Sequence, residues 1–332
     1  MLRPLLRLAG LLLLPLLLTL LLTLRPTAAP AQTFAPAADQ YFTDALALLR
    51  ENAVGRRQVD WPKLEQQLRA RAFQVATIPE TYPLLRLAVQ ALNDHHSTFV
   101  PPAALTTAQL PLTAPTRRAA PDTVAGPADV GYLRVPPFKG TDAQARQYVA
   151  RLRDQLQRQD QPGLRGWVVD LRGNPGGNLW VMLAALGPVV GEGVLGYFAP
   201  GKGRFEAWGY RQGRAFTGRT PYPLLAEPYQ LRQPARAVAV LTDGRTASSA
   251  EALAVALRGR PGTRSFGQPT FGIPSATTTY PLSDGALLNL TTAYFADRTR
   301  RVYDAPLVPD EALAPGQTLS RAVEWVRAQA QP

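Results

Sequence analysis

The hydrophobic pattern changes character along the chain. Within residues 38–96, apolar side chains recur at helical spacing, for example Tyr41, Ala45 and Leu48, which predicts amphipathic helices. From Gly131 onward, short apolar runs alternate with longer helical patterns. The expected strands are 130–135, 167–171, 237–241, 277–281 and 286–292, the expected helices are 143–157, 179–186 and 250–258, and 194–210 has a hairpin pattern. This alternation predicts an α/β fold built from βαβ units.

The same pattern divides the chain into four expected segments. They are a signal peptide or N-terminal membrane anchor (1–31), a helical N-terminal domain (36–97), a Pro/Thr-rich linker or loop (98–129) and an α/β catalytic core (130–327). The third segment is too short and too rich in proline to form a domain of its own.

The first thirty residues have the features of a targeting segment. Arg3 and Arg7 precede an apolar run, Leu11–Leu24, and small residues around Ala29 form a cleavage pattern. The run is shorter than the roughly 20 residues of a membrane span, and extending it back to Leu8 makes it marginal, so a cleaved signal and a retained anchor are both open. The chain has no cysteine, which excludes a lipid-modified cysteine and any disulfide.

Charge does not identify a partner. The formal net charge is +12, and removal of Arg3, Arg7 and Arg25 with the first 31 residues would leave +9. The arginines are scattered, without a basic run or an aromatic platform. We therefore expect no nucleic-acid partner, and we attribute the positive net charge to a bias in amino-acid composition as much as to function.

A serine pair follows the apolar run 237–241. Residues 246–251, Thr-Ala-Ser-Ser-Ala-Glu, open a helical pattern, so Ser248 and Ser249 fall at a strand–turn–helix junction. A hydroxyl at such a corner suits a nucleophile, because the free N–H groups of the first helical turn face an incoming oxyanion. The alternative is that Thr246, Ser248 or Ser249 is an ordinary helix N-cap.

A glycine turn follows the apolar run 167–171. Its sequence, Arg-Gly-Asn-Pro-Gly-Gly-Asn over residues 172–178, permits a sharp turn and close backbone approach to a ligand. Its amides are candidates to face a developing negative charge. Together the two junctions suggest two halves of one acyl-transfer site.

Both histidines of the chain are adjacent, at His95 and His96. If an imidazole activates the serine, it must be one of these two. The alternative is a surface or capping role at a helix end. A metal site is not expected, because adjacent histidines lack the spacing that puts two ligands on one helical face. No cofactor is expected either.

With these motifs, the chain resembles the tail-specific (C-terminal processing) serine protease family. The matching segments are residues 131–135, 170–177, 246–251, 267–272 and 309–310. The resemblance implies a crotonase-like (ClpP/crotonase-type) spiral core with an N-terminal helical bundle. It places Ser248 at the nucleophile position, and Gly177 and Ser249 at the oxyanion hole.

One position departs from the best-known branch of that family. Its members carry a lysine general base directly after the Phe-Gly pair, where this chain has Ile273. The other branch uses a Ser/His pair, lacks a PDZ domain and includes the nisin-resistance peptidases. Leu92, Asp94, His96 and Ser97 fit its histidine pattern, so the resemblance makes His96 the base, with His95 as the second choice.

The group that orients the imidazole stays open between Asp94, Glu251 and Asp310. The sequence thus predicts an exported serine endopeptidase, periplasmic, extracellular or membrane-anchored, which acts on peptides or protein tails through an acyl-enzyme. Two alternatives remain: an inactive peptide- or ligand-binding member of the same fold, for which Ile273 is the argument, and an esterase or amidase, which would use the same site chemistry.

Overall fold

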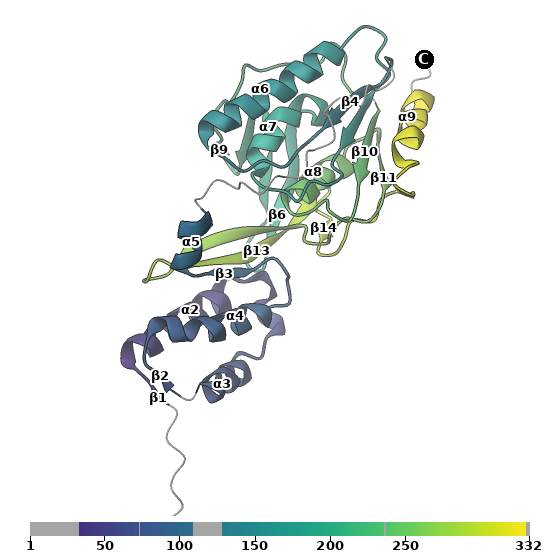
Figure 1. The fold of residues 1–332 in the computed structure, drawn as a ribbon. Helices are drawn as coiled ribbons and strands as arrows, with labels where there is room; N and C mark the ends of the chain where they lie inside the picture. Colours follow the sequence, from purple (N-terminus) through teal and green to yellow (C-terminus); the bar gives the residue numbers. More distant parts are fainter. Residues whose placement is uncertain (1–32, 73, 109–127, 236, 330–332) are drawn as a thin grey trace, which may run out of the picture.

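The computed structural model describes residues 33–72, 74–108, 128–235 and 237–329 (Figure 1). A small helical region leads into a larger part built on two sheets. The helices are α2 (Pro36–Asn52), α3 (Trp61–Arg71), α4 (Tyr82–Gln90), α5 (Pro102–Ala108), α6 (Asp142–Gln159), α7 (Leu179–Val190), α8 (Ser249–Arg258) and α9 (Thr318–Gln329), with 3₁₀ turns η1 (Val54–Gln58) and η2 (Ile78–Thr81). Across the described ranges, no helix combines the length and the apolar character needed to cross a bilayer.

The first large sheet is parallel and carries the two predicted junctions. Its strand order is β15 (Glu311–Ala312), β11 (Thr263–Gly267), β10 (Val238–Thr242), β5 (Trp167–Asp170) and β4 (Gly131–Arg134). Every residue of β5 and β10 is buried. Val169 and Val240 pack in the cluster that includes α7 and α8, whereas Val168 and Leu241 pack with α9. Burial on both faces explains the continuous apolar runs in the sequence.

The second large sheet is antiparallel. Its order is β12 (Ser275–Pro281), β13 (Leu287–Asp297), β6 (Gly193–Pro200), β7 (Glu206–Arg211), β8 (Arg214–Thr217) and β9 (Thr220–Pro221), and β3 (Thr98–Val100) and β14 (Val302–Tyr303) also pair with β13. A short parallel pair, β1 (Thr33–Phe34) and β2 (Gln74–Val75), lies among the first helices.

The first helices pack against the β12–β13 hairpin. Leu288 and Leu290 of β13 share a buried cluster with Phe42, Leu46 and other side chains of α2 and α4. At the hairpin turn, the Asp284 carboxylate accepts hydrogen bonds from the hydroxyls of Tyr41 (2.9 Å) and Tyr82 (2.5 Å). The segment that carries both histidines, between α4 and β3, is therefore held against the second sheet.

The α/β class and the main elements of the core are confirmed. Each expected strand and helix from residue 130 to 292 has a counterpart within a few residues, and α7 continues four residues beyond its predicted end. The pattern did not predict β11 as a strand or α9 as a helix. Within the expected linker, residues 98–100 form β3, which joins the second sheet. The expected targeting segment 1–31 lies outside the described residues.

Candidate active site

Ser248 sits between β10 and α8 in an unusual backbone conformation. Its φ of 53° and ψ of −120° contrast with the extended N-caps Thr141 (φ −76°, ψ 168°) and Asn178 (φ −81°, ψ 102°) of the same molecule. Ser248 occupies the N-cap position and forms a capping box with Glu251, as the structural alternative anticipated. An ordinary N-cap has no need of such a backbone, which costs about 1–3 kcal/mol for a non-glycine residue and is typical of functional sites.

Glu251 holds this strained turn in place. Its fully buried carboxylate accepts hydrogen bonds from the backbone N–H of Ser248 (2.7 Å), the hydroxyl of Thr270 (2.6 Å) and the amides of Gly272 and Ile273 (3.1 Å each). Burial raises the pKa of Glu251 above its usual value, and these hydrogen bonds offset part of the rise. One carboxylate thus joins the serine turn to the turn that precedes β12.

The glycine turn after β5 packs directly on the serine turn. Gly176 and Gly177 have φ of 96° and 128°, and a Cβ placed on Gly176 would lie 2.9 Å from Ser249 N and 3.0 Å from Ser248 Cβ. The Ser249 hydroxyl donates to the carbonyl of Gly177 (2.7 Å), and Ala247 N donates to the carbonyl of Asn174 (3.0 Å). The structure therefore brings Gly177, Ser248 and Ser249 together.

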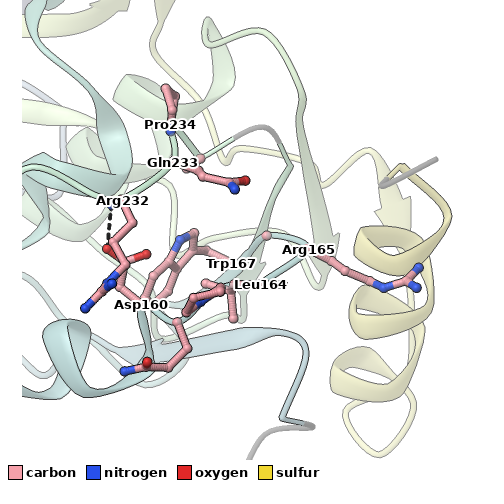
Figure 2. A pocket seen from close by; sticks show the side chains of 11 residues that line it. Asp160, Leu164, Arg165, Trp167, Arg232, Gln233 and Pro234 are labelled. Atoms are coloured by element: carbon pink, nitrogen blue, oxygen red, sulfur yellow. Dashed lines mark hydrogen bonds between the residues drawn. The ribbon is translucent and has the colours of Figure 1, made fainter. Parts of the chain in front are cut away.

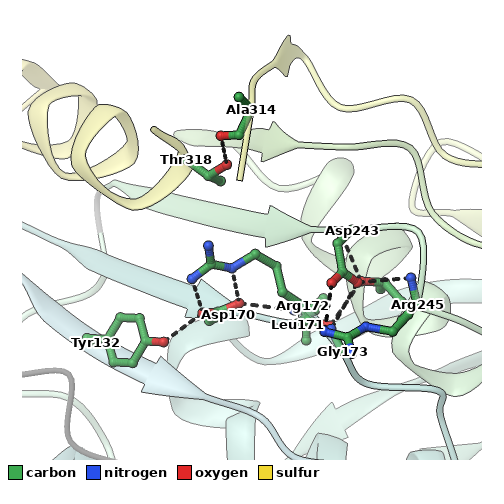
Figure 3. Close-up of polar contacts among 10 residues, drawn as sticks. Tyr132, Asp170, Leu171, Arg172, Gly173, Asp243, Arg245, Ala314 and Thr318 are labelled. Atoms are coloured by element: carbon green, nitrogen blue, oxygen red, sulfur yellow. Dashed lines mark hydrogen bonds and ion pairs between the residues drawn. The ribbon is translucent and has the colours of Figure 1, made fainter. Parts of the chain in front are cut away.

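Charged side chains form hydrogen bonds that stabilise the glycine turn and the serine turn at the end of the parallel sheet (Figure 3). Asp170, the last residue of β5, accepts hydrogen bonds from the Tyr132 hydroxyl (2.6 Å) and from the guanidinium of Arg172 (2.6 and 2.9 Å). Asp243, which follows β10, accepts from the backbone N–H of Gly173 (2.9 Å). These contacts limit how far one turn can move relative to the other.

Two backbone amides at this junction are available for an anion. Within the described part of the chain, neither the Gly177 nor the Ser249 amide donates a hydrogen bond to a protein atom. Ser249 is the first residue of α8, where N–H groups have no partner inside the helix. The geometry suits an oxyanion placed between the two turns.

Replacement of Gly177 by Ala is expected to damage both the fold and the site. The added Cβ would lie 2.1 Å from the Phe138 carbonyl oxygen, at a φ that L-residues avoid. We expect a loss of about 2–4 kcal/mol in the free energy of unfolding, measured by chemical denaturation. Gly285→Ala is the matched control, because Gly285 also has a positive φ (85°) but nothing lies within 4 Å of the added Cβ. Equal losses in the two variants would contradict the close-packing argument.

The two histidines differ in their surroundings. His95 is exposed, whereas His96 is half-buried, and its Nδ1 lies 2.8 Å from the hydroxyl of Ser275. Asp94 accepts from the backbone amides of His96 (3.1 Å) and Ser97 (2.8 Å) and from the Ser97 hydroxyl (2.6 Å). Asp94 thus stabilises the loop and makes no hydrogen bond to the His96 ring. Burial lowers the pKa of His96, and the charge of Asp94 opposes this shift.

An open cleft of about 450 Å³ is lined by the glycine turn, the serine turn and the start of β12. Ser248 and Ser275 both line it, together with Gly177, Asn178, Leu179, Trp180, Phe198, Ser249, Ala276, Thr277 and Phe295. No hydrogen bond joins the Ser248 hydroxyl to the His96 ring in the described part of the chain. Catalytic hydrogen bonds are often longer in the absence of substrate. Ser275 therefore has two neighbours of interest: it lines the cleft that contains Ser248, and its hydroxyl contacts the His96 imidazole.

The three groups considered as imidazole partners have other roles. Asp94 and Glu251 accept hydrogen bonds from backbone and hydroxyl groups, as described above, and Asp310 accepts from the amide and hydroxyl of Ser265 (2.8 and 2.7 Å). Sequence reasoning missed Ser275, which is 179 residues from His96 in the chain and carries no motif. Ile273 donates its amide to Glu251, and no lysine lines the cleft.

A second pocket lies at the opposite end of the parallel sheet (Figure 2). It is formed around Trp167, at the start of β5, and around residues 232–235, which precede β10. Asp160 at the edge of this pocket accepts hydrogen bonds from the Tyr229 hydroxyl and the Arg232 amide (2.7 Å each). Its carboxylate therefore stabilises the segment around residues 229–232. In the described ranges no group of three or more His, Cys, Asp or Glu residues has a geometry that could hold a metal ion.

A serine at a strained strand–turn–helix junction, next to a glycine turn with open amides, is the arrangement of a serine hydrolase. Comparison with known proteins agrees and is more specific. The model of peptidase family S41 matches residues 129–312, and the chain belongs to this family. The predicted family membership is confirmed, and the protein is a peptidase.

Two curated relatives and two solved structures illustrate the similarity. The chain is 26% identical to the nisin-resistance protein of Lactococcus lactis subsp. lactis over 299 residues, 89% of this chain and 88% of that protein. It is 31% identical to a carboxyl-terminal-processing protease of Synechocystis sp. over 185 residues, 55% of this chain and 38% of that protein.

The fold is similar to that of a lipoprotein from Streptococcus agalactiae (TM-score 0.71, 22% identity, 89% of this chain and 98% of the other). It is also similar to the photosystem II D1 C-terminal processing protease (TM-score 0.58, 17% identity, 90% and 98%). At these identities the structural similarity concerns the fold alone.

Proposed function

We propose that this protein is an exported serine endopeptidase that cleaves peptides or protein tails with Ser248 as nucleophile and His96 as general base. The observation that carries the proposal is the strained Ser248, which lies against the glycine turn in a cleft that is also lined by Ser275, the hydrogen-bond partner of His96. The membership of family S41 supports the peptidase class.

In this mechanism, His96 takes the proton of the Ser248 hydroxyl as the Ser248 oxygen attacks a peptide carbonyl carbon. The amides of Gly177 and Ser249 donate hydrogen bonds to the resulting oxyanion, and each is worth roughly 3 kcal/mol in the transition state. His96 then gives its proton to the leaving amine. Water next attacks the acyl-enzyme, again with His96 as base, and releases the acid and the free serine.

The lining of the cleft supports an uncharged peptide segment as substrate. Trp180, Phe198 and Phe295 supply its aromatic side chains, with ring centroids about 6 Å apart for the Trp180–Phe198 and Phe198–Phe295 pairs. Among the described residues that line the cleft, none carries a charge. We therefore propose an apolar side chain next to the scissile bond. The names of the relatives, nisin resistance and carboxyl-terminal processing, also point to peptide substrates.

The alternatives predict different results with the same protein. An esterase or amidase would turn over small esters or amides and leave peptide libraries intact. An inactive binding protein, for which Ile273 is the argument, would retain its biological effect after His96→Ala and would not react at Ser248. Labelling by a fluorophosphonate probe, followed by digestion of a peptide library and an ester library, separates the three functions.

The remaining sequence predictions belong to this proposal. Export depends on residues 1–31 as a cleaved signal or retained anchor, and N-terminal sequencing of the protein from fractionated cells distinguishes the two. We also keep the crotonase-like description of the core, the helical N-terminal domain over 36–97 and the domain boundaries as expectations.

The pH dependence of kcat/KM provides a test of the base. His96 must be neutral to accept a proton, and burial lowers its pKa below the ordinary value of about 6.5. Activity should therefore rise with pH through a midpoint below that value, and it should persist in mildly acidic buffer. The measurement is kcat/KM for a fluorogenic peptide between pH 4 and 8. A midpoint well above the ordinary histidine value would contradict His96 as a buried base.

A further inference from the structure

Ser275 forms a hydrogen bond with the side chain of the proposed base. Its hydroxyl lies 2.8 Å from His96 Nδ1, and the residue is only 3% exposed. Asp94, Glu251 and Asp310, the carboxylates considered above, make no hydrogen bond to the ring. The imidazole therefore has a neutral hydroxyl where many serine hydrolases have a carboxylate.

The backbone around Ser275 fixes the position of that hydroxyl. Ser275 N donates to the Ile273 carbonyl (2.7 Å), and Phe295 N donates to the Pro274 carbonyl (2.9 Å). Ile273, two residues before Ser275, donates its amide to Glu251, and the same carboxylate accepts the amide of Ser248. One buried carboxylate thus connects the backbone of the nucleophile to the segment that presents Ser275 to His96.

We propose that Ser275 is a positioning residue that sets the tautomer and the orientation of His96, an inference that rests on the proposed function. In this arrangement the Ser275 oxygen accepts a hydrogen bond from Nδ1–H, which leaves the lone pair of Nε2 for the proton of Ser248. If Ser275 instead donated to Nδ1, the proton of the neutral ring would be on Nε2, and His96 would be unable to act as a base.

The proposal also explains how the ring works after it takes the proton. When Ser248 attacks, its proton moves to Nε2, and the imidazolium then carries N–H groups at both positions. The Ser275 oxygen remains an acceptor for Nδ1–H in both charge states, so the ring does not need to turn before it protonates the leaving amine. A neutral acceptor stabilises the imidazolium less than a carboxylate does, and burial separately lowers the pKa of His96.

The test compares Ser275→Ala and Ser275→Thr with Thr278→Ala. Thr278 lies on the same strand, and its exposed hydroxyl forms a hydrogen bond with Thr292 (2.9 Å), so it is a control for the loss of a hydroxyl from β12. Ser275→Ala should lower kcat by roughly 10- to 100-fold, a part of the 10²–10⁴ that a general base contributes, with KM within about twofold. Ser275→Thr should recover most of the rate, and Thr278→Ala should match the wild type.

A second measurement reports the tautomer directly. The chain has only two histidines, so ¹⁵N spectra of the imidazoles contain two ring systems, which the spectrum of His95→Gln assigns. We expect the Nδ1–H form for His96 in the wild type and a shift toward the Nε2–H form in Ser275→Ala. A wild-type ring in the Nε2–H form would overturn the proposal, even if Ser275→Ala failed to fold.

The outcomes separate this inference from the proposed function. An active wild type whose kcat and tautomer are unchanged in Ser275→Ala would overturn the role of Ser275 and leave the Ser248–His96 mechanism standing. A folded wild type that fails to turn over peptides or to react with a fluorophosphonate would contradict the proposed function, while the tautomer would still decide which way Ser275 is bonded.

Discussion

Ser248→Ala is expected to reduce kcat by a factor on the order of 10⁴–10⁶, the range associated with removal of a nucleophile. The reason is chemical, because the alanine side chain has no oxygen to form the acyl-enzyme. The fold should survive, since the hydrogen bond to the buried Glu251 carboxylate comes from the backbone N–H of Ser248, and loss of the capping hydroxyl costs only about 1 kcal/mol. Turnover of a fluorogenic peptide and fluorophosphonate labelling measure the loss, and thermal denaturation checks the fold.

Ser320→Ala provides the control for this variant. Ser320 lies on α9, its exposed hydroxyl donates to the Gln317 carbonyl (3.0 Å), and it is outside the cleft. It should retain full activity and full labelling. If Ser248→Ala kept more than a few per cent of the wild-type rate, another residue would have to be the nucleophile and the proposed mechanism would be wrong.

The sequence predicted three strands of the parallel sheet, β4, β5 and β10, and its two junctions because their signals are local. Runs such as 167–171 and 237–241 are apolar on both faces, and the residues that end them belong to turns with strong backbone preferences. Gly177, Ser248 and Ser249 lie close together because β5 and β10 are parallel neighbours, and the carboxyl ends of such strands meet at one edge of the sheet.

The contact between His96 and Ser275 was not predictable in this way. It depends on how the first helices pack against the β12–β13 hairpin, which is a tertiary arrangement without a short-range pattern. Ser275 also looks like an ordinary strand residue, since it begins a run of Ser, Ala and Thr. The strained backbone of Ser248 was also not predictable from the sequence, because serine at a helix start normally indicates an unstrained N-cap.

Glu251→Ala is expected to cause the largest loss of stability, about 3–5 kcal/mol in the free energy of unfolding. The substitution removes the acceptor from four donors: the amides of Ser248, Gly272 and Ile273 and the hydroxyl of Thr270. Each buried donor without a partner costs about 1–3 kcal/mol, and partial entry of water reduces the sum. For a protein of this size the loss corresponds to a fall of roughly 5–8 °C in Tm.

Glu324→Ala is the matched control, because Glu324 is an exposed acid on α9 that forms a surface ion pair with Arg321. It should change the free energy of unfolding by less than about 0.5 kcal/mol. Denaturation by urea measures the stability of both variants, and a similar small effect for Glu251→Ala would contradict the role assigned to its carboxylate.

Where Glu251→Ala remains folded, its rate of peptide turnover should also fall, because Glu251 holds the amide of Ser248 in the strained conformation and anchors the segment that leads to Ser275. Stability and catalysis therefore depend on the same buried group, and a variant that lost one and kept the other would show that the two turns are held independently.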